Sequence, residues 1–170
     1  MDTHSPSAAT PDEMVGLYRD LSVQAQGLMS GQTHRVANAA NLSALIDQSL
    51  DNINWVGFYF LDDDPWGGDS PVLLVGPFQG KPACVRIEIG QGVCGTAVAT
   101  GETQRVADVH AFEGHIACDP QSRSEIVIPV RHRGEIIGVL DIDSPDPDRF
   151  DATDQAGLEH LAECYSASLG

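Results

Sequence analysis

The stretch that decides the fold is SEIVIPVRHRGEIIGVLDID, residues 124–143. It contains two runs rich in β-branched and other apolar residues, 124–130 and 136–142. The polar segment 131–134, which ends in glycine, separates them. Two apolar runs joined by a short glycine-containing turn are typical of a β-hairpin. The stretch therefore predicts an antiparallel sheet.

Three carboxylates lie on these two predicted strands. Asp141 and Asp143 are two residues apart, so their side chains should point to the same face. Glu125 begins the neighbouring strand, and antiparallel pairing would bring it near Asp141. Crowded carboxylates raise one another's pKa, so one of them could stay protonated near neutral pH and donate a proton. The acids could also bind a ligand's ammonium group, or simply form a solvent-facing strand end.

The rest of the chain adds helices and further strands around this hairpin. Apolar residues at helical spacing predict helices from about residue 11 to 28, from 33 to 50 and from 153 to 169. Strands are expected at 53–61, 72–78, 83–89 and 104–106, a short helix at 96–99 after a glycine-rich turn at 90–95, and a long polar loop at 108–123. This order predicts a single α+β domain, residues 12–170, after a disordered tail, residues 1–11.

Composition excludes several classes of partner. The formal net charge is −16, from 25 acidic and 9 basic residues, so no basic surface is available to bind nucleic acid. No run of about 18 apolar residues exists, which argues against a membrane span. The first eleven residues are polar and do not resemble a signal peptide. A cytoplasmic protein is the simplest expectation.

The four cysteines form no Cys-x-x-Cys pair, which argues against a zinc ribbon or a thioredoxin motif. Cys118 lies in the long polar loop, where packing gives no reason for a thiol, and it is a candidate redox nucleophile. A sulfenic acid condenses with a nearby thiol, and Cys84 or Cys94 could supply it. Alternatively, each of these three cysteines is a small buried hydrophobe. Cys164, in the last helix, is expected to be ordinary packing.

Two other groups of residues could contribute to a site. Trp55 and Tyr59 share one face of the strand at 53–61, where they could line a pocket or belong to the core. Acids, histidines and Cys118 together would allow a metal site. No ligand spacing supports one, so no metal is predicted.

Taken together, these motifs resemble the free methionine-(R)-sulfoxide reductases, a family built on a GAF domain. The segments that carry the resemblance are NWVGFY (54–59), GPFQGK (76–81), ACVRI (83–87), GVCGTA (92–97), DVH (108–110), GHIACD (114–119), SEIV (124–127) and GVLDIDS (138–144). The match runs from about residue 14 to 161. A generic GAF domain would share the apolar strands but not three cysteines in these contexts.

The resemblance implies an antiparallel sheet flanked by helices, with a pocket under the loop of Cys118. It implies an enzyme without a cofactor in which Cys118 attacks the sulfur of free methionine-(R)-sulfoxide, releases methionine and becomes a sulfenic acid. Cys84 is favoured as the resolving residue and Cys94 is the alternative. Thioredoxin would then reduce the disulfide. A homodimer is also implied.

The resemblance also gives expectations for the pocket. Glu125, Asp141 and Asp143 match the acids that contact substrate, and Trp55, with Tyr59 beside it, matches the aromatic residue that holds the methyl end. Which acid protonates the departing oxygen and which holds the ammonium group stays open. The competing hypothesis is a GAF-type small-molecule sensor without turnover. A sensor would have no need of the cysteines beside the acids.

Overall fold

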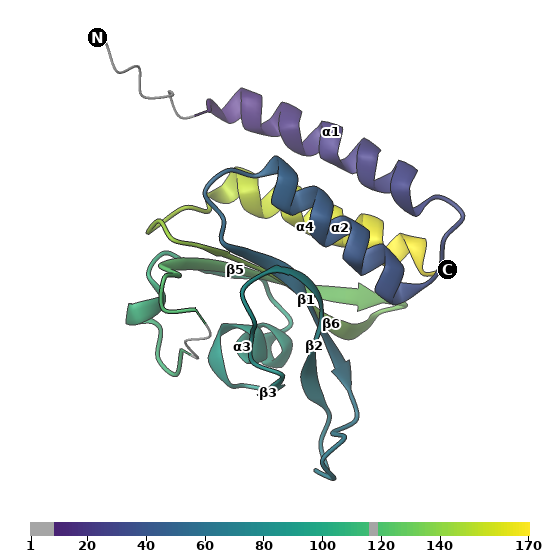
Figure 1. Ribbon diagram of the computed structural model, residues 1–170, viewed down its shortest axis with the longest axis vertical. Coiled ribbons are helices and arrows are strands. Elements are labelled where there is room, and N and C mark those ends of the chain that lie inside the picture. The colour runs from purple at the N-terminus through teal and green to yellow at the C-terminus, as the bar shows by residue number, and fades with distance from the viewer. Residues whose placement is uncertain (1–8, 116–118) are drawn as a thin grey trace.

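The computed structural model describes residues 9–115 and 119–170 (Figure 1). Residues 1–8, most of the predicted tail, and residues 116–118, which include Cys118, lie outside the described residues. In chain order the elements are α1 (Pro11–Met29), α2 (Arg35–Ser49), β1 (Trp55–Asp62), β2 (Val72–Gly80), β3 (Arg86–Glu88), α3 (Gly92–Thr100), β4 (Gln104–Val106), the 3-10 helix η1 (Val109–Ala111), β5 (Ser124–His132), β6 (Glu135–Ser144) and α4 (Ala152–Ser168). The predicted α+β architecture is confirmed.

One six-stranded sheet organises the domain. Its strand order is β3-β2-β1-β6-β5-β4, and every neighbouring pair is antiparallel. The predicted hairpin forms β5 and β6. A register shift between Val130 and Arg131 places Glu125 directly opposite Asp143 and Val127 opposite Asp141. The prediction that Glu125 lies near Asp141 is confirmed, because the donor atoms of Cys94 and of these two acids lie within 4.8 Å of one another. Across the strands, Glu125 pairs directly with Asp143.

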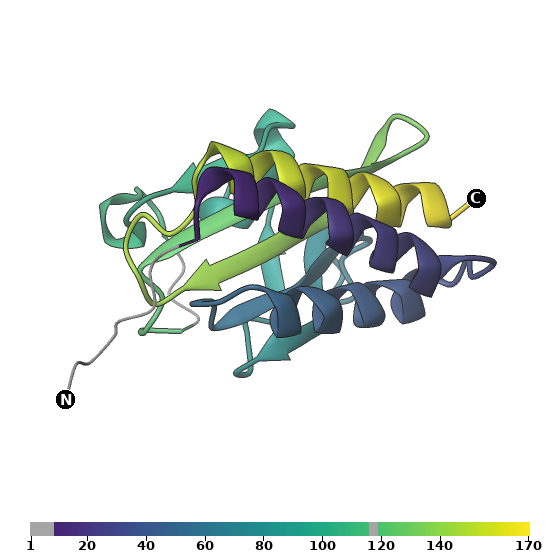
Figure 2. The ribbon, with the colours of Figure 1, turned by 90° about the horizontal axis from the view of Figure 1, so that it is seen from above.

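Helices α2 and α4 cover one face of the sheet, with α1 packed over them as an outer layer, while α3 packs on the other face (Figures 1 and 2). The predicted N-terminus of α1 is confirmed: Thr10 and Glu13 form a capping box, and Pro11 is the first helical residue. Helices α1 and α4 approach closely because Gly157 has no side chain. A Cβ there would lie 2.1 Å from the ring of Tyr18. No helix within the described ranges is both long and apolar enough to span a membrane.

The alternation of side chains along β1 divides the interior into two clusters. Val56, Phe58 and Phe60 face the three helices and belong to the larger core. Trp55 and Tyr59 face the other way and pack with residues of β3 and α3 in a smaller cluster. The predicted separation of the two faces is therefore confirmed. The smaller cluster is the wall of the candidate site.

Two predicted elements differ from the structure, both beside the smaller cluster. Helix α3 begins at Gly92, so Cys94 lies in its first turn and not in the flexible turn that was expected. Glycine is required at position 95 because a Cβ there would lie 2.4 Å from the carbonyl oxygen of Glu88. Strand β3 is limited to three residues and begins after Cys84. Its pairing with β2 ends at Leu74, close to Pro77, where the register between β1 and β2 shifts. Proline cannot donate a hydrogen bond to a neighbouring strand, so a bulge is a position that tolerates it.

Candidate active site

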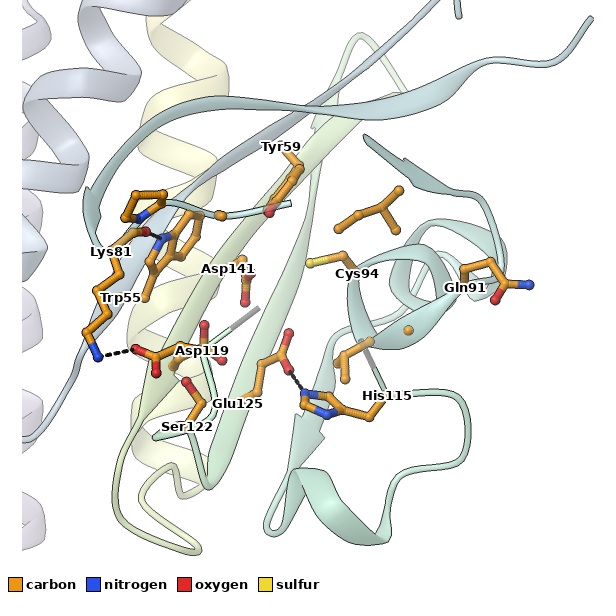
Figure 3. A pocket seen from close by; sticks show the side chains of 16 residues that line it. Trp55, Tyr59, Lys81, Gln91, Cys94, His115, Asp119, Ser122, Glu125 and Asp141 are labelled. Atoms are coloured by element: carbon orange, nitrogen blue, oxygen red, sulfur yellow. Dashed lines mark hydrogen bonds and ion pairs between the residues drawn. The ribbon is translucent and has the colours of Figure 1, made fainter. Parts of the chain in front are cut away.

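A cavity of about 40 Å³ lies on the sheet face opposite the three helices, between the strands, α3 and the loop that precedes β5 (Figure 3). Its walls come from distant parts of the sequence. The lining residues are Trp55, Tyr59, Lys81, Pro82, Ala83, Ile87, Gln91, Gly92, Val93, Cys94, His115, Asp119, Ser122, Glu125, Asp141 and Asp143. All three predicted acids and both predicted aromatic residues therefore meet at one cavity.

The strand register explains why the three acids converge. Asp143 of β6 pairs with Trp55 of β1 on one side and with Glu125 of β5 on the other. Asp141, two residues earlier on β6, points to the same face and pairs with Gly57. The absence of a side chain at Gly57 is enforced by packing, since a Cβ there would lie 2.3 Å from Cβ of Phe78.

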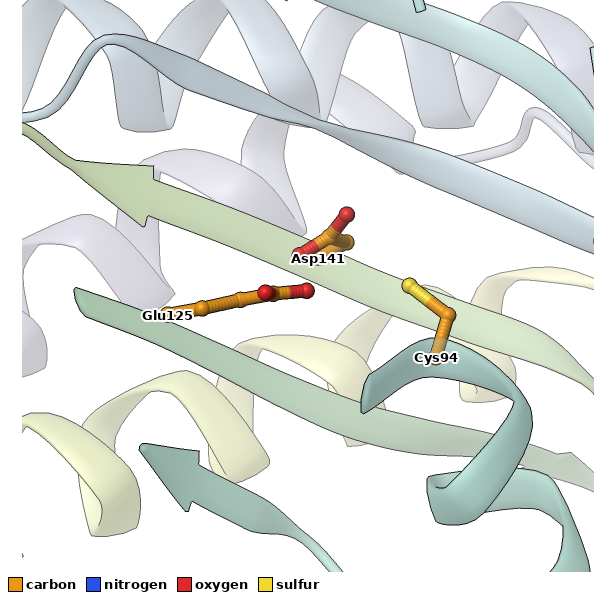
Figure 4. Close-up of side chains that lie close together, drawn as sticks. All are labelled: Cys94, Glu125 and Asp141. Atoms are coloured by element: carbon orange, nitrogen blue, oxygen red, sulfur yellow. The ribbon is translucent and has the colours of Figure 1, made fainter. Parts of the chain in front are cut away.

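Cys94, Glu125 and Asp141 form the tightest part of the site (Figure 4). Their sulfur and carboxylate oxygens lie within 4.8 Å of one another, and all three residues are buried. The side chain of Asp141 is incompletely satisfied, because its Oδ1 is buried and finds no hydrogen-bond partner among the described residues. A buried carboxylate oxygen without a partner is costly, so it indicates a group that a ligand completes.

Burial sets the protonation of the three acids. It raises the pKa of Asp141 to about 6, against the opposing effect of hydrogen bonding with Glu125 and Cys94. The pKa of Glu125 lies well above its usual range, because of burial and then of the charges of Asp141 and Asp143. The pKa of Asp143 is also well above normal, first because water is excluded from its carboxyl and then because Asp141 and Asp119 are near. At neutral pH the cluster therefore holds protons, and Asp141 is the acid that ionises most readily.

Two further groups complete the polar wall. His115 Nε2 lies 3.7 Å from Glu125 Oε2, and burial lowers the pKa of this imidazole, followed by the effect of His110. Burial, together with Asp141 and Glu125, raises the pKa of the Cys94 thiol. Cys94 is thus a protonated thiol in the resting pocket, which does not suit a nucleophile.

Trp55 and Tyr59 form the apolar wall. Their rings stack with centroids 5.9 Å apart, and Phe78 stacks on Trp55 at 5.2 Å. The indole of Trp55 donates a hydrogen bond to the carbonyl oxygen of Lys81 (3.1 Å), and the hydroxyl of Tyr59 donates to that of Cys84 (3.1 Å). With their polar atoms paired to backbone, both rings present carbon surface to the cavity.

Sequence reasoning missed the residues that hold the loop before β5 against the pocket. Asn54 Nδ2 donates to Asp119 Oδ2 and to Ser122 Oγ, both at 3.2 Å. Lys81 Nζ lies 3.6 Å from Asp119 Oδ2. Asn54 and Asp119 stand beside Trp55 and Cys118 in the sequence, within segments that carry the family resemblance, and this position was the available signal. These contacts fix Asp119, the residue that follows Cys118, at the cavity wall.

The cysteines separate into three groups. Cys84 is disulfide-bonded, and its carbonyl oxygen contacts Tyr59 at the pocket. Cys94 is a free thiol inside the pocket. Cys164 is also free, but it is buried on α4 and accepts a hydrogen bond from Gln26, in agreement with the packing interpretation. The predicted nucleophile, Cys118, lies outside the described residues.

This arrangement can bind a small molecule that has both a cationic and an apolar end. The acids suit an ammonium group, the aromatic wall suits an alkyl group, and the protonated carboxyls can donate a proton to an acceptor between them. The disulfide-bonded Cys84 contacts Tyr59 of the apolar wall through its carbonyl oxygen. Together these features support reductive chemistry on a small amino acid derivative.

Known proteins are similar to this chain in fold and in sequence. The GAF domain family model matches residues 17–169. The free methionine-R-sulfoxide reductase of Escherichia coli is 54% identical over 144 residues, covering 85% of this chain and 83% of that protein. Among solved structures, the reduced form of fRMsr of Staphylococcus aureus is 51% identical with a TM-score of 0.84, covering 90% of this chain and 95% of that one. The free methionine-R-sulfoxide reductase of Neisseria meningitidis, in complex with its substrate, is 41% identical with a TM-score of 0.86, covering 99% and 96%.

Proposed function

The chain belongs to the GAF-domain free methionine-R-sulfoxide reductases, and from that premise we propose that it reduces free L-methionine-(R)-sulfoxide to L-methionine. The observation that carries the proposal is the convergence of Glu125, Asp141 and Asp143 opposite an aromatic wall, beside the disulfide-bonded Cys84. A pocket built this way suits a free amino acid, whose ammonium group a residue inside a peptide lacks.

In the proposed complex, Asp141 holds the substrate's ammonium group. Asp141 is the acid whose pKa, about 6, leaves it ionised at neutral pH, and its Oδ1 has no partner among the described residues. The ammonium group would satisfy that oxygen and balance its charge. Trp55 and Tyr59 would then enclose the methyl end of the substrate.

Glu125 is the proposed proton donor. Its raised pKa keeps it protonated near neutral pH, as a general acid requires. His115, whose Nε2 lies 3.7 Å from the carboxyl and whose side chain is 14% exposed, connects Glu125 with solvent and can return the proton. Asp143, opposite both Trp55 and Glu125, would be a second contact to the ammonium group.

The chemical step transfers oxygen from the substrate to a cysteine. The thiolate of Cys118 attacks the sulfoxide sulfur while Glu125 protonates the sulfoxide oxygen. A bond forms between the two sulfurs. The hydroxyl then passes from the substrate sulfur to the sulfur of Cys118, the bond between the sulfurs breaks, methionine leaves, and Cys118 becomes a sulfenic acid. The sulfur of the substrate is reduced by two electrons and that of Cys118 is oxidised by two.

Cys84 is the proposed resolving residue. Its thiol would attack the sulfenic acid of Cys118, form a disulfide and release water. Two observations support Cys84 over Cys94. Cys84 is disulfide-bonded, whereas Cys94 is free and has a raised thiol pKa, which disfavours the thiolate needed for attack. Thioredoxin would supply the two electrons that reopen the disulfide.

Several expectations remain part of this proposal. Residues 12–170 would act as one catalytic domain that needs no cofactor, in the cytoplasm, and two copies would form a homodimer.

The test is a thioredoxin-coupled assay with four substrates: free R and free S sulfoxides of methionine, a peptide containing methionine-(R)-sulfoxide, and free methionine as a blank. We expect turnover of the free R isomer alone. Equal turnover of the peptide would contradict the role of the ammonium group. Binding of the free R isomer without its consumption would instead indicate a sensor.

A further inference from the structure

We propose that Cys94, Glu125 and Asp141 form a binding site for a thiophilic divalent cation, Zn²⁺ being the ion that their donor atoms fit best. The site lies within the pocket described above but uses it for another ligand. Binding of the metal needs only the geometry of the pocket. Its consequence, the exclusion of substrate, rests on the proposed function.

The donor set and its spacing favour zinc. One thiolate sulfur and two carboxylate oxygens are ligands that Zn²⁺ takes at about 2.0–2.3 Å, usually in a tetrahedron. In such a tetrahedron neighbouring ligand atoms are about 3.4–3.6 Å apart, given these bond lengths. The three donor atoms already lie within 4.8 Å of one another, so movements of about 1 Å, within reach of side-chain rotation, would close the site.

A fourth ligand is available at the correct distance. His115 Nε2 lies 3.7 Å from Glu125 Oε2, close to the spacing expected of two ligands of one zinc ion. His115 has a lowered pKa and is therefore neutral at pH 7, the state that binds metals. Three residues from β5, β6 and α3 and one from the neighbouring loop would then surround the ion (Figures 3 and 4).

An independent observation points to a cationic ligand at this cluster. Asp141 is only 6% exposed, yet its Oδ1 has no hydrogen-bond partner among the described residues. The backbone positions of the three ligands are fixed by secondary structure, since Glu125 and Asp141 lie on paired strands and Cys94 lies in the first turn of α3. A divalent cation would displace the protons of Cys94 and Glu125 to solvent and coordinate the oxygen left without a partner.

The proposed consequence is mutual exclusion between Zn²⁺ and substrate. The metal would occupy Glu125 and Asp141, the same acids that are proposed to donate the proton and to hold the ammonium group. Zinc would therefore be an inhibitor that competes with free methionine-(R)-sulfoxide.

The test uses the full-length protein in its oxidised form, in which Cys84 is in a disulfide and the described free thiols are Cys94 and Cys164. Zn²⁺ affinity is measured by competition with a chromophoric chelator, and Cd²⁺ is added separately to record the ultraviolet absorption of a metal–thiolate bond. We expect one ion per chain and a thiolate band. The Cys94→Ser variant should lose the band. Its Zn²⁺ affinity should fall by about 10- to 100-fold or more, because changes to residues that only support the ligands already cost that much.

Two further variants keep the outcome decisive. Cys164→Ser, a matched change at the other free thiol, should leave affinity and band unchanged. Glu125→Gln should keep the band but lose about 10-fold or more in affinity, and it serves if Cys94→Ser does not fold. Wild-type affinity in either pocket variant, or loss of binding in Cys164→Ser, would overturn the site.

The two proposals fail separately. The titration involves no turnover, so an inactive enzyme that still binds Zn²⁺ through Cys94 would contradict only the proposed function. An active enzyme without metal binding would contradict only this inference. Free methionine-(R)-sulfoxide should also lower the apparent Zn²⁺ affinity.

Discussion

The two faces of the sheet each bury carboxylates, and they treat them in opposite ways. On the helix-covered face, Asp154 is fully partnered: it accepts hydrogen bonds from the hydroxyl of Tyr18 (2.7 Å), from Arg149 (3.1 Å) and from the backbone of Asp151 (3.0 Å). On the pocket face, Asp141 lies beside two further acids, and its Oδ1 has no partner among the described residues. One carboxylate is part of the scaffold, and the other is incomplete without a ligand.

The difference identifies the functional face by physical criteria alone. A buried acid surrounded by donors stabilises the fold, whereas buried acids surrounded by other acids destabilise it unless a ligand intervenes. The protein tolerates the unpaired acids of the pocket because stability comes from elsewhere, namely from the partnered Asp154 and the large core under α1, α2 and α4. Variants on the two faces should therefore have opposite effects on stability and activity.

The largest expected effect is on the chemical step. Glu125→Gln removes the proposed proton donor with little change in shape, so the rate of methionine formation should fall by about 10²- to 10⁴-fold. A rapid-quench single turnover with free methionine-(R)-sulfoxide measures it. Asp154→Asn, on the other face, is the control and should keep its rate. A loss below tenfold in Glu125→Gln would remove this residue from the mechanism.

The next largest effect is on thioredoxin-dependent turnover, in which Cys84 and Cys94 should differ. Cys84→Ala should complete the first turnover and then stop, because thioredoxin has no disulfide to reduce. Cys94→Ala should continue to turn over with thioredoxin. The yield of methionine per enzyme, first without and then with excess thioredoxin, separates the two. If Cys94→Ala alone stopped after the first turnover, Cys94 and not Cys84 would be the resolving residue.

On the helix-covered face, Asp154→Asn should destabilise the fold. The change weakens charge-assisted hydrogen bonds from Tyr18 and Arg149, so the free energy of unfolding should fall by about 2–3 kcal/mol in urea titrations. Tyr18→Phe, which removes a single donor, should cost about half as much. If Asp154→Asn were as stable as wild type, the proposed division between the two faces would be wrong.

The last effect, at most about as large, should have the opposite sign. Burial raises the pKa of Asp141 from 3.8 to about 6, so the folded protein binds this proton more tightly than the unfolded chain. Its contribution to stability is present below about pH 4 and is lost as the pH rises through 6. At pH 8 Asp141→Asn should therefore be more stable than wild type, by up to about 3 kcal/mol, since each pKa unit corresponds to about 1.4 kcal/mol.

Urea titrations at pH 4 and pH 8 test this sign. The advantage of Asp141→Asn should be absent at pH 4 and present at pH 8, while its KM for free methionine-(R)-sulfoxide should rise. A variant less stable than wild type at both pH values would show that Asp141 is structural.

The sequence predicts which side chains of the site share a face of the sheet. It does not predict the strand register or the long-range contacts around the site. Period-two alternation is strict, so the common face of Asp141 and Asp143 and the opposite faces of Trp55 and Val56 follow directly from the pattern. The proximity of Glu125 to Asp141 also follows from the hairpin. Its directly opposite residue, Asp143, does not, because the bulge near Arg131 shifts the register and one extra residue in a strand leaves no mark in an apolar pattern.

Two other features depend on tertiary contacts. The start of α3 is hidden by glycine and other small residues, whose weak helix propensity also fits a turn. Asn54 and Asp119 are 65 residues apart, and only the folded chain brings them together. Neither feature can be predicted from local sequence.

One measurement tests the central claim most directly: methionine formed in a single turnover of free methionine-(R)-sulfoxide by Cys118→Ser, compared with wild type. The account predicts one methionine per wild-type chain from the R isomer and none from the variant, because Cys118 is the proposed nucleophile and the free thiol that lines the pocket, Cys94, has a raised pKa. Methionine formation by Cys118→Ser at the wild-type rate would contradict it.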